Sequence, residues 1–175
     1  MKRKEDSEVA EVNAEHVLIF LHGVGGSGDE WSSFLQDILP SKTKLILPTA
    51  PKATVDMFGW MEMNSWFNMY STYASNIPEV KNATIMIHSL MYQEMKRGIP
   101  AEQILLGGFS QGAALALYSS LTFPFKLGGT LVLSGWLLAP WEFPNEVQML
   151  PNYHSPLLQC HGERDMMVGL LHKLC

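Results

Sequence analysis

Five short apolar segments, separated by helical patterns, constrain the fold of this chain more than any other feature. They are continuous runs rather than alternating ones, at 17–21, 44–48, 103–109, 129–135 and 156–162. A strand with one face in water alternates apolar and polar residues, so a continuous run is typical of strands buried on both faces of a parallel sheet. Parallel strands are joined by right-handed crossovers that carry helices. We therefore predict an α/β fold, a three-layer domain with a mostly parallel sheet.

Three helices are predicted between these strands. Apolar residues recur at helical spacing in 31–39, with Asp29 in position to cap the helix start. A second helix is predicted around 87–95, and Gly98 is placed to end it. A third helix is expected at 111–122, directly after the third apolar segment.

Two segments fit neither period and are predicted to be long connections. Segment 56–70 is dense in methionine and aromatic residues, and segment 136–156 carries four of the ten prolines. Because α/β proteins place their sites at one end of the sheet, in loops that follow strands, we expect both connections there. The chain is divided into a charged tail at 1–15, expected to be disordered, and a single α/β domain at 16–175.

The composition excludes several classes of function. A chain of 175 residues that is 47% hydrophobic forms a real core, and its net charge of -5 offers no basic patch for nucleic acid. No apolar run approaches the ~18 residues of a membrane span. Cys160 and Cys175 suggest neither a disulfide framework nor a metal site. Because 1–15 lacks the apolar core of a secretory signal, we expect a cytoplasmic protein. We also expect that the protein needs no metal or cofactor.

The motif that indicates chemistry is GFSQG, between the third apolar segment and the third helix. In this G-x-S-x-G pattern, Ser110 would occupy a sharp, strained turn that lifts its hydroxyl above the sheet. Gly108 and Gly112 would let the strand and the helix pass close together. Since a helix N-terminus favours negative charge, the N–H of Gln111 would be one donor of an oxyanion hole. The alternative is a glycine-rich turn that serves packing only.

A second oxyanion donor is expected in the glycine-rich segment LHGVGGSGDEW, which follows the first apolar run. His22 and Gly23 come directly after the predicted strand, and the N–H of Val24 would face the developing oxyanion. A glycine-rich loop before a helix also suits a phosphate group, and this alternative stays open. The loop lacks the lysine-containing phosphate-loop pattern, however, and its glycines miss the dinucleotide-binding spacing.

An acid that could orient a catalytic base follows the fifth apolar segment, in the sequence HGERD. In G-x-S-x-G hydrolases the acid comes after the serine in the chain, at the end of a strand, which favours Asp165. Glu163 is the competing acid. A helix cap is the competing role for Asp165.

Together these motifs resemble the acyl-protein thioesterases and lysophospholipase-like carboxylesterases, a family of small α/β hydrolases. The resemblance rests on FLHGVGGSGDEW, PTAP, SWFN, GIPAEQILLGGFSQGAALAL and LQCHGERD, and it covers about 16–168. It implies that Ser110 is the nucleophile, Asp165 the orienting acid, and Val24 and Gln111 the backbone oxyanion donors. It also implies cleavage of long-chain acyl thioesters on proteins, such as S-palmitoyl groups, or of acyl esters of lysophospholipids and smaller esters.

An acyl-chain site is predicted in the segment rich in methionine and tryptophan. Flexible thioethers and flat aromatic rings suit a promiscuous apolar tail, so we expect the chain to lie against Trp60, Met63, Trp66 and Phe67. Trp66 also falls at the family's S-W-F-D motif beside the acyl site, where Asn68 replaces the aspartate. The alternative is that these side chains only pack onto the sheet.

The resemblance also implies a triad histidine well beyond the acid, after a further helix and a final strand. The chain ends at Cys175, and we expect it to be C-terminally truncated, without the last strand, the last helix and the triad histidine. His172 is the only histidine after Asp165, and in a helix it would lie roughly 10 Å along the axis from that acid. Two functions therefore stay open: a serine thioesterase or esterase, and an inactive acyl-binding or regulatory module.

Overall fold

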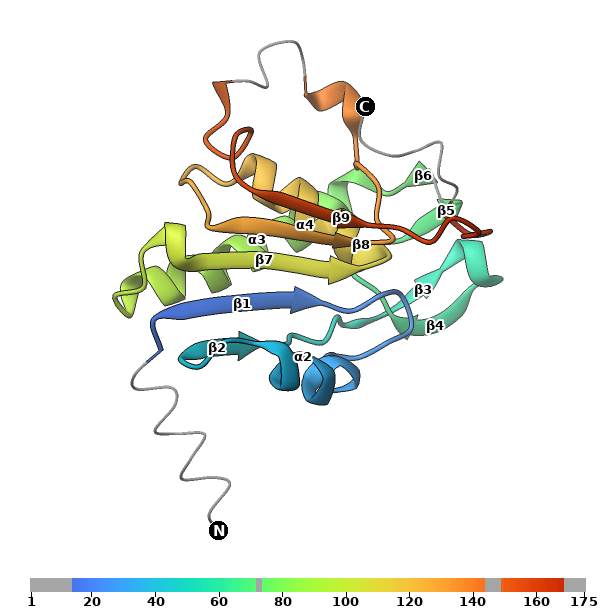
Figure 1. Cartoon of the computed structure of the whole chain (residues 1–175). Coiled ribbons are helices and arrows are strands. Elements are labelled where there is room, and N and C mark those ends of the chain that lie inside the picture. The colour runs from blue at the N-terminus through green and yellow to red at the C-terminus, as the bar shows by residue number, and fades with distance from the viewer. Residues whose placement is uncertain (1–13, 72–73, 144–148, 169–175) are drawn as a thin grey trace.

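The main feature of the computed structural model, which describes residues 14–71, 74–143 and 149–168, is a five-stranded sheet. Its strand order is β2-β1-β7-β8-β9, and every neighbouring pair is parallel (Figure 1). The strands are β1 (His16–Leu21), β2 (Thr43–Ile46), β7 (Ile104–Phe109), β8 (Gly129–Leu133) and β9 (Leu157–Cys160). All five predicted strands are confirmed.

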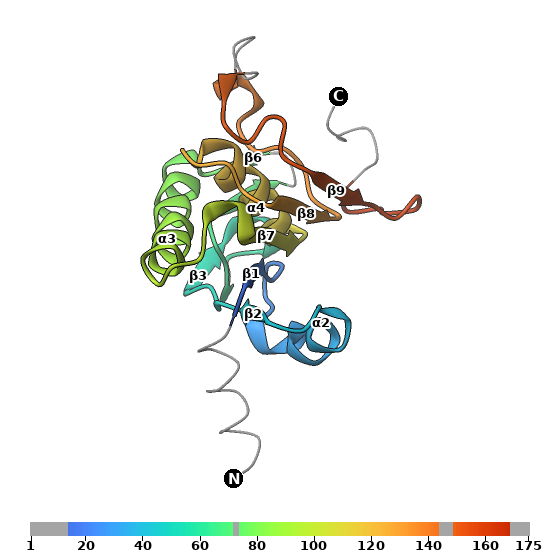
Figure 2. The same cartoon turned by 60° about the vertical axis from the view of Figure 1, so that its left-hand side comes forward.

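Helices cover the two faces of this sheet unequally (Figure 2). The longer helices, α3 (Ile77–Lys96) and α4 (Gln111–Thr122), lie on one face, and the short α2 (Ser32–Ile38) lies on the other, which makes the three predicted layers. Successive side chains of a strand point to opposite faces. Val17, Ile19 and Leu21 of β1 accordingly belong to the large core beneath α3 and α4, whereas Leu18 and Phe20 pack toward α2. Burial on both faces explains the continuous apolar run in the sequence.

The α2 side of the sheet is open over its last three strands. The strand register places Leu105, Phe109 and Leu158 on the same face as Leu18. Leu105 and Phe109 are each 39% exposed, and Leu158 on the outermost strand is 60% exposed. Within the part of the chain that the structure describes, this apolar face is therefore accessible to solvent.

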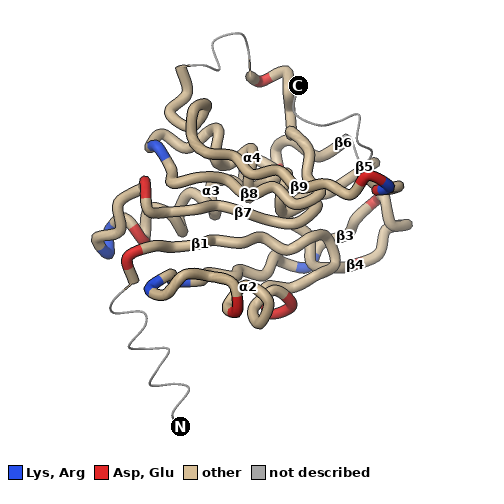
Figure 3. The backbone as a smooth tube through the Cα atoms, in the orientation of Figure 1, with Lys and Arg blue, Asp and Glu red and all other residues tan. Residues whose placement is uncertain are grey.

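Charged side chains are nearly absent from the five strands (Figure 3). Lys44 in β2 is the exception, and its Nζ lies 3.2 Å from a carboxylate oxygen of Glu94 in α3. The Glu94 side chain is only 3% exposed, and it also pairs with Arg97. A buried carboxylate is tolerated when it is paired in this way. The Lys44–Glu94–Arg97 cluster joins α3 to β2, at the end of the sheet opposite Ser110.

Smaller elements follow the main strands in the chain, and four of them, the strands β3 to β6, lie beyond the carboxyl ends of the main strands (Figure 1). They are β3 (Lys52–Val55), β4 (Met61–Asn64), β5 (Met69–Ser71), β6 (Ala74–Ser75) and the 3-10 helices η1 (Gly28–Trp31), η2 (Asp56–Phe58), η3 (Ala101–Gln103) and η4 (Pro140–Glu142). η3 alone precedes a main strand, β7, and lies at the opposite end. The two-stranded sheets β3-β4 and β5-β6 were not predicted, because segment 56–70 has no clean period.

Two helix starts differ from the sequence prediction. Asp29 is not the cap of α2, because it lies inside η1, and the residue at the N-cap of α2 is Trp31. The second helix begins well before 87, at Ile77. Its N-cap is Asn76, whose side chain accepts a hydrogen bond from the N–H of Glu79 and donates one to the Glu79 carboxylate. Gly98 has φ +98° directly after this helix, as predicted.

The remaining sequence predictions concern the termini and the membrane. Residues 1–13 of the predicted tail and His172 lie outside the described residues. Among the helices that the structure does describe, none is long and apolar enough to cross a membrane.

Candidate active site

Ser110 lies between the end of β7 and the start of α4, and its backbone has a conformation that is rare for residues other than glycine. Its φ is 52° and its ψ is -118°, outside the regions that L-residues populate freely. Neighbours hold it on both sides: its N–H donates to the carbonyl of Leu133 at 2.8 Å, and its own carbonyl accepts from Ala114 at 3.0 Å. Strain of this kind persists only where the surroundings enforce it, and it concentrates at functional sites.

The two glycines of the motif are required by close backbone contacts. A Cβ atom at Gly112 would lie 2.3 Å from the carbonyl oxygen of Leu21 and 2.4 Å from that of His22. A Cβ at Gly108 would lie 2.5 Å from the carbonyl carbon of Gly112. The start of α4 therefore presses directly against the end of β1, and the predicted close passage of strand and helix is confirmed.

The loop after β1 lies beside the serine. A Cβ at Gly23 would be 3.4 Å from Cβ of Ser110. The loop is folded back by a bond from the N–H of Gly26 to the carbonyl of Gly23 at 3.1 Å, and it is tied to β4 by a bond from Gly25 to Asn64 at 2.8 Å. Val24, between them, lines the same small cavity as Ser110.

The backbone N–H groups of Val24 and Gln111 are the two candidate oxyanion donors. Among the described residues, neither group donates to a protein acceptor. One belongs to the loop beside the serine and the other to the first residue of α4, where unpaired N–H groups carry the positive end of the helix dipole. Two backbone donors of this type can stabilise an anionic oxygen when both point at it.

His22 has a structural role in this loop. Its Nδ1–H donates to the carbonyl of Gly23 at 2.6 Å, and its Nε2 accepts from the N–H of Ala50 at 2.9 Å. Both ring nitrogens are occupied, and burial lowers the pKa of His22 below its ordinary value. The ring is therefore neutral and cannot take a proton from Ser110.

Asp165 follows β9 and shapes the turn after it. Its Oδ1 accepts hydrogen bonds from the N–H groups of Met167 at 3.0 Å and Val168 at 2.9 Å. The bond from Val168 is the main reason why the pKa of Asp165 lies below its ordinary value. Glu163, the competing acid, is exposed. Asp165 is thus a charged carboxylate. Its hydrogen bond from the N–H of Val168 holds that residue in the turn, where Val168 lines the same cavity as Ser110.

The cavity at Ser110 is almost wholly apolar. Its other lining residues are Val24, Met57, Phe58, Met69, Trp136, Met167 and Val168. They come from the loop after β1, η2, β5, the loop after β8 and the turn after β9, so five segments meet at the serine. Such a lining suits a hydrophobic group attached to a carbonyl carbon.

Comparison with known proteins identifies the family of this chain. Residues 5–174 match the family described as Phospholipase/Carboxylesterase. The chain belongs to this family. It is 36% identical over 167 residues to acyl-protein thioesterase 1 of Kluyveromyces lactis, covering 90% of this chain and 72% of that protein. The corresponding protein of Saccharomyces cerevisiae is 35% identical, with 90% and 73% covered.

Solved structures of similar proteins share the fold. Arabidopsis thaliana SOBER1 aligns with a TM-score of 0.79 at 30% identity, covering 91% of this chain and 79% of that one. Acyl-protein thioesterase 2 of Zea mays aligns with a TM-score of 0.78 at 28% identity, covering 91% and 76%. The sheet of this phospholipase/carboxylesterase family member is therefore that of the α/β-hydrolase esterases.

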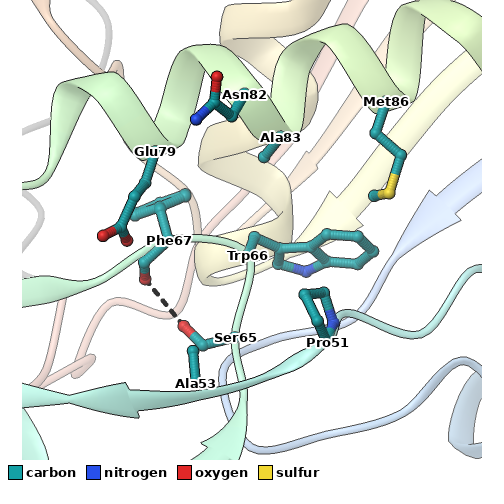
Figure 4. A pocket seen from close by; sticks show the side chains of 9 residues that line it. All are labelled: Pro51, Ala53, Ser65, Trp66, Phe67, Glu79, Asn82, Ala83 and Met86. Carbon is teal, nitrogen blue, oxygen red and sulfur yellow. Dashed lines mark hydrogen bonds between the residues drawn. The ribbon is translucent and has the colours of Figure 1, made fainter.

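The residues predicted to hold the acyl chain are not among those that line the Ser110 cavity. Trp66 and Phe67 are buried, and both line a second cavity between β3 and α3, where Met86 lies near the indole (Figure 4). Met63 packs beside the loop after β1, and Trp60 is 72% exposed. Met57, Phe58, Met69 and Trp136, which sequence reasoning did not assign, line the Ser110 cavity instead; they come from the two segments predicted as connections.

None of the described histidines of this family member lines the Ser110 cavity. His88 connects the two large helices, through a bond from its Nε2 to the carbonyl of Ser119 at 2.9 Å. His161 bonds the carbonyl of Val168 at 2.7 Å. No group of three or more His, Cys, Asp or Glu side chains within the described ranges could hold a metal ion.

Proposed function

We propose that this chain is a serine hydrolase of the acyl-protein thioesterase and carboxylesterase type, with Ser110 as nucleophile. One observation carries the proposal: a strained serine at a helix start adjoins an apolar cavity, and two backbone N–H groups without protein acceptors belong to the segments on either side of it. Membership of the phospholipase/carboxylesterase family supports it. The names of the thioesterase relatives extend it to acylated proteins as substrates.

The proposed reaction has two steps. Oγ of Ser110 adds to the carbonyl carbon of the ester or thioester as a base takes its proton, and the N–H groups of Val24 and Gln111 bind the resulting oxyanion. The bond from carbon to sulfur or oxygen then breaks, and the leaving group takes up that proton. Water finally attacks the acyl-serine, which releases a carboxylic acid and restores Ser110.

Asp165 is proposed to orient the imidazole that acts as the base. A serine needs a neutral imidazole within hydrogen-bond reach. In the printed chain only His172 follows Asp165, and it lies outside the described residues. A second function follows from the same observation. If no imidazole reaches Ser110, the chain is an acyl-binding or regulatory module that keeps the apolar cavity and lacks turnover.

The apolar lining of this small cavity supports a hydrophobic group next to the reacting carbonyl carbon. Family membership and the names of the thioesterase relatives support an acyl group on a protein, a lysophospholipid or a smaller ester. We also propose a cytoplasmic location with transient contact with membrane surfaces. Cys160 is a free thiol, as is usual in a reducing compartment.

Labelling with a long-chain fluorophosphonate tests the proposal, because Oγ of an activated serine displaces its fluoride. We expect mass spectrometry to find the adduct on Ser110 and to find none in Ser110→Ala. Saturable binding of decanoate by both proteins, without any adduct, would identify the acyl-binding module instead. Absence of both labelling and decanoate binding would contradict both functions.

A further inference from the structure

The side chain of Gln111 is fully buried. Its amide spans the 65–67 segment: Oε1 accepts from the N–H of Trp66 at 3.1 Å, and Nε2 donates to the carbonyl of Phe67 at 2.8 Å and to Oγ of Ser65 at 2.9 Å. A backbone N–H only donates and a carbonyl only accepts, so these partners fix the orientation of the amide. The residue after the nucleophile is thus joined to the 65–67 segment through both the oxygen and the nitrogen of its side-chain amide.

The same segment reaches the loop after β1 on its other side. Nε1–H of Trp66 donates to the carbonyl oxygen of His22 at 2.8 Å, and the indole lies against the imidazole with ring centres 5.0 Å apart. The imidazole in turn bonds the carbonyl of Gly23 at 2.6 Å. Trp66 therefore restrains the two residues that precede Val24.

These contacts form one continuous path between the two candidate oxyanion donors. It runs from Gln111 through its amide to Trp66, and from the indole through His22 and Gly23 to Val24. All the side chains on this path are buried, and polar contacts in a buried site are strong and costly to break. Both donors belong to backbone segments, so their separation depends on what braces those segments.

We propose that the side chains of Gln111 and Trp66 are positioning residues, which hold the N–H groups of Val24 and Gln111 at a fixed separation. This inference rests on the proposed function, in which those groups bind the oxyanion. Stabilisation of an oxyanion depends on donors that are in place before charge develops. Loosening the brace should slow the chemical step and leave binding of the uncharged acyl group nearly unchanged.

Two variants break the path at different points and keep side-chain bulk. Trp66→Phe removes the indole N–H, and Gln111→Met removes the amide. Trp141→Phe is the matched control, because Trp141 is 71% exposed and lies outside the path. Ser65→Ala, which removes a single hydroxyl from the network, is a milder variant should either of the others fail to fold.

The first measurement does not depend on reactivity. In NMR spectra of the 175-residue chain, Trp66→Phe should shift the backbone amide resonance of Val24. Gln111→Met should accelerate hydrogen exchange of the Trp66 indole N–H at least ten-fold, while the melting temperature shows a folded protein. The control should do neither. An unmoved Val24 resonance together with unchanged indole exchange would overturn the proposal.

The second measurement separates reaction from binding. With a fluorophosphonate, both variants should lower the maximal labelling rate of Ser110 by about 10- to 100-fold. This decrease is no larger than the decrease that follows removal of a whole oxyanion donor. The reversible affinity for the probe should change less than three-fold. Equal loss of rate and affinity would indicate a general structural role and overturn the proposal. If the unmodified chain is not labelled, the proposed hydrolase function fails. The NMR result alone then tests whether Gln111 and Trp66 hold the two N–H groups in place.

Discussion

Nε2 of His161 lies 3.4 Å from Oδ2 of Asp165, in a turn where the same imidazole bonds the carbonyl of Val168. The candidate acid therefore already has a histidine neighbour, but this ring holds the turn closed and does not line the Ser110 cavity. Its Nδ1 is buried with no partner among the described residues. Asp165 and His161 together fix the position of Val168 at the edge of the cavity.

The first prediction distinguishes Asp165 from Glu163 as the acid. Asp165→Asn keeps an oxygen for the N–H groups of Met167 and Val168 but loses the charge that would orient an imidazolium. We expect it to lower the fluorophosphonate labelling rate of Ser110 at least ten-fold, with a small change in melting temperature. Glu163→Gln, at an exposed position, should leave the rate unchanged; a loss in this variant alone would assign the role to Glu163.

The free energy of unfolding should decrease as the pH drops below about 6.5, the ordinary pKa of histidine. Burial lowers the pKa of both His22 and His88 in the folded chain, so the unfolded chain binds protons first as the pH falls. Their stabilising contribution is present above about pH 6.5 and is lost below it, with a slope of up to about 1.4 kcal/mol per pH unit for each group. Urea unfolding between pH 7.5 and 5.5 measures this.

Substitution of single histidines shows how much each contributes to the pH dependence of stability. His88→Gln should remove up to one proton from the difference in uptake, whereas His154→Gln, in an exposed position, should leave the slope as it is. A slope that is equal in the unmodified chain and in His88→Gln would show that His88 does not contribute.

Gly112→Ala should be far more damaging than Gly98→Ala. At Gly112 the new methyl group would meet two backbone carbonyls at 2.3 Å and 2.4 Å, which cannot move without displacing β1. At Gly98 no atom lies within 4 Å, and only the positive φ opposes a side chain. We expect a loss of about 1–2 kcal/mol at Gly98 and of more than about 3 kcal/mol, or no folded protein, at Gly112. Similar unfolding midpoints for the two variants would contradict the close contact.

The acyl-chain site can be located by variants that separate the two sets of candidate residues. Met69→Trp should fill the Ser110 cavity and weaken binding of decanoate at least ten-fold more than that of butyrate, since each buried methylene contributes about 0.8 kcal/mol. Met149→Trp, at a position that is 84% exposed, is the control. If Trp66→Ala selectively weakens decanoate and Met69→Trp does not, the acyl chain lies on the 65–67 side.

The open sheet face should cause self-association at micromolar concentration. β9 is the outermost strand of the sheet, it carries no charged residue, and Leu157 and Leu158 on its two faces are 47% and 60% exposed. Such an edge is a template for pairing with another chain. Sedimentation should show oligomers that Leu158→Lys reduces. A stable monomer before the substitution would contradict this prediction.

The main sheet was predictable because burial on both faces leaves a direct trace in the sequence. β1 alternates between two cores and reads as an uninterrupted apolar run. The start of α3 was missed, although Asn76 and Glu79 have the spacing of a capping box and Pro78 suits a first helical turn. The sequence therefore does contain a local signal for the start of α3.

The elements around the site left no such trace. β3 and β4 pair through the register of Val55 with Met61, across a turn in which Gly59 and Trp60 both have positive φ. Neither strand has a fully buried face, so neither shows a period. Likewise, Gln111 contacts Trp66 across 45 residues of sequence. Contacts of this range depend on the folded topology, and one sequence does not record them.

Ten consecutive residues of α4, from Gln111 to Ser120, are buried. A helix enclosed on all sides exposes its amides only when the domain around it opens, so its hydrogen exchange should be among the slowest in the chain. The turn after β9 is more open, with Met166 98% and Met167 55% exposed. We therefore expect opening of the core around α4 to be slower than exchange of a ligand at the turn after β9.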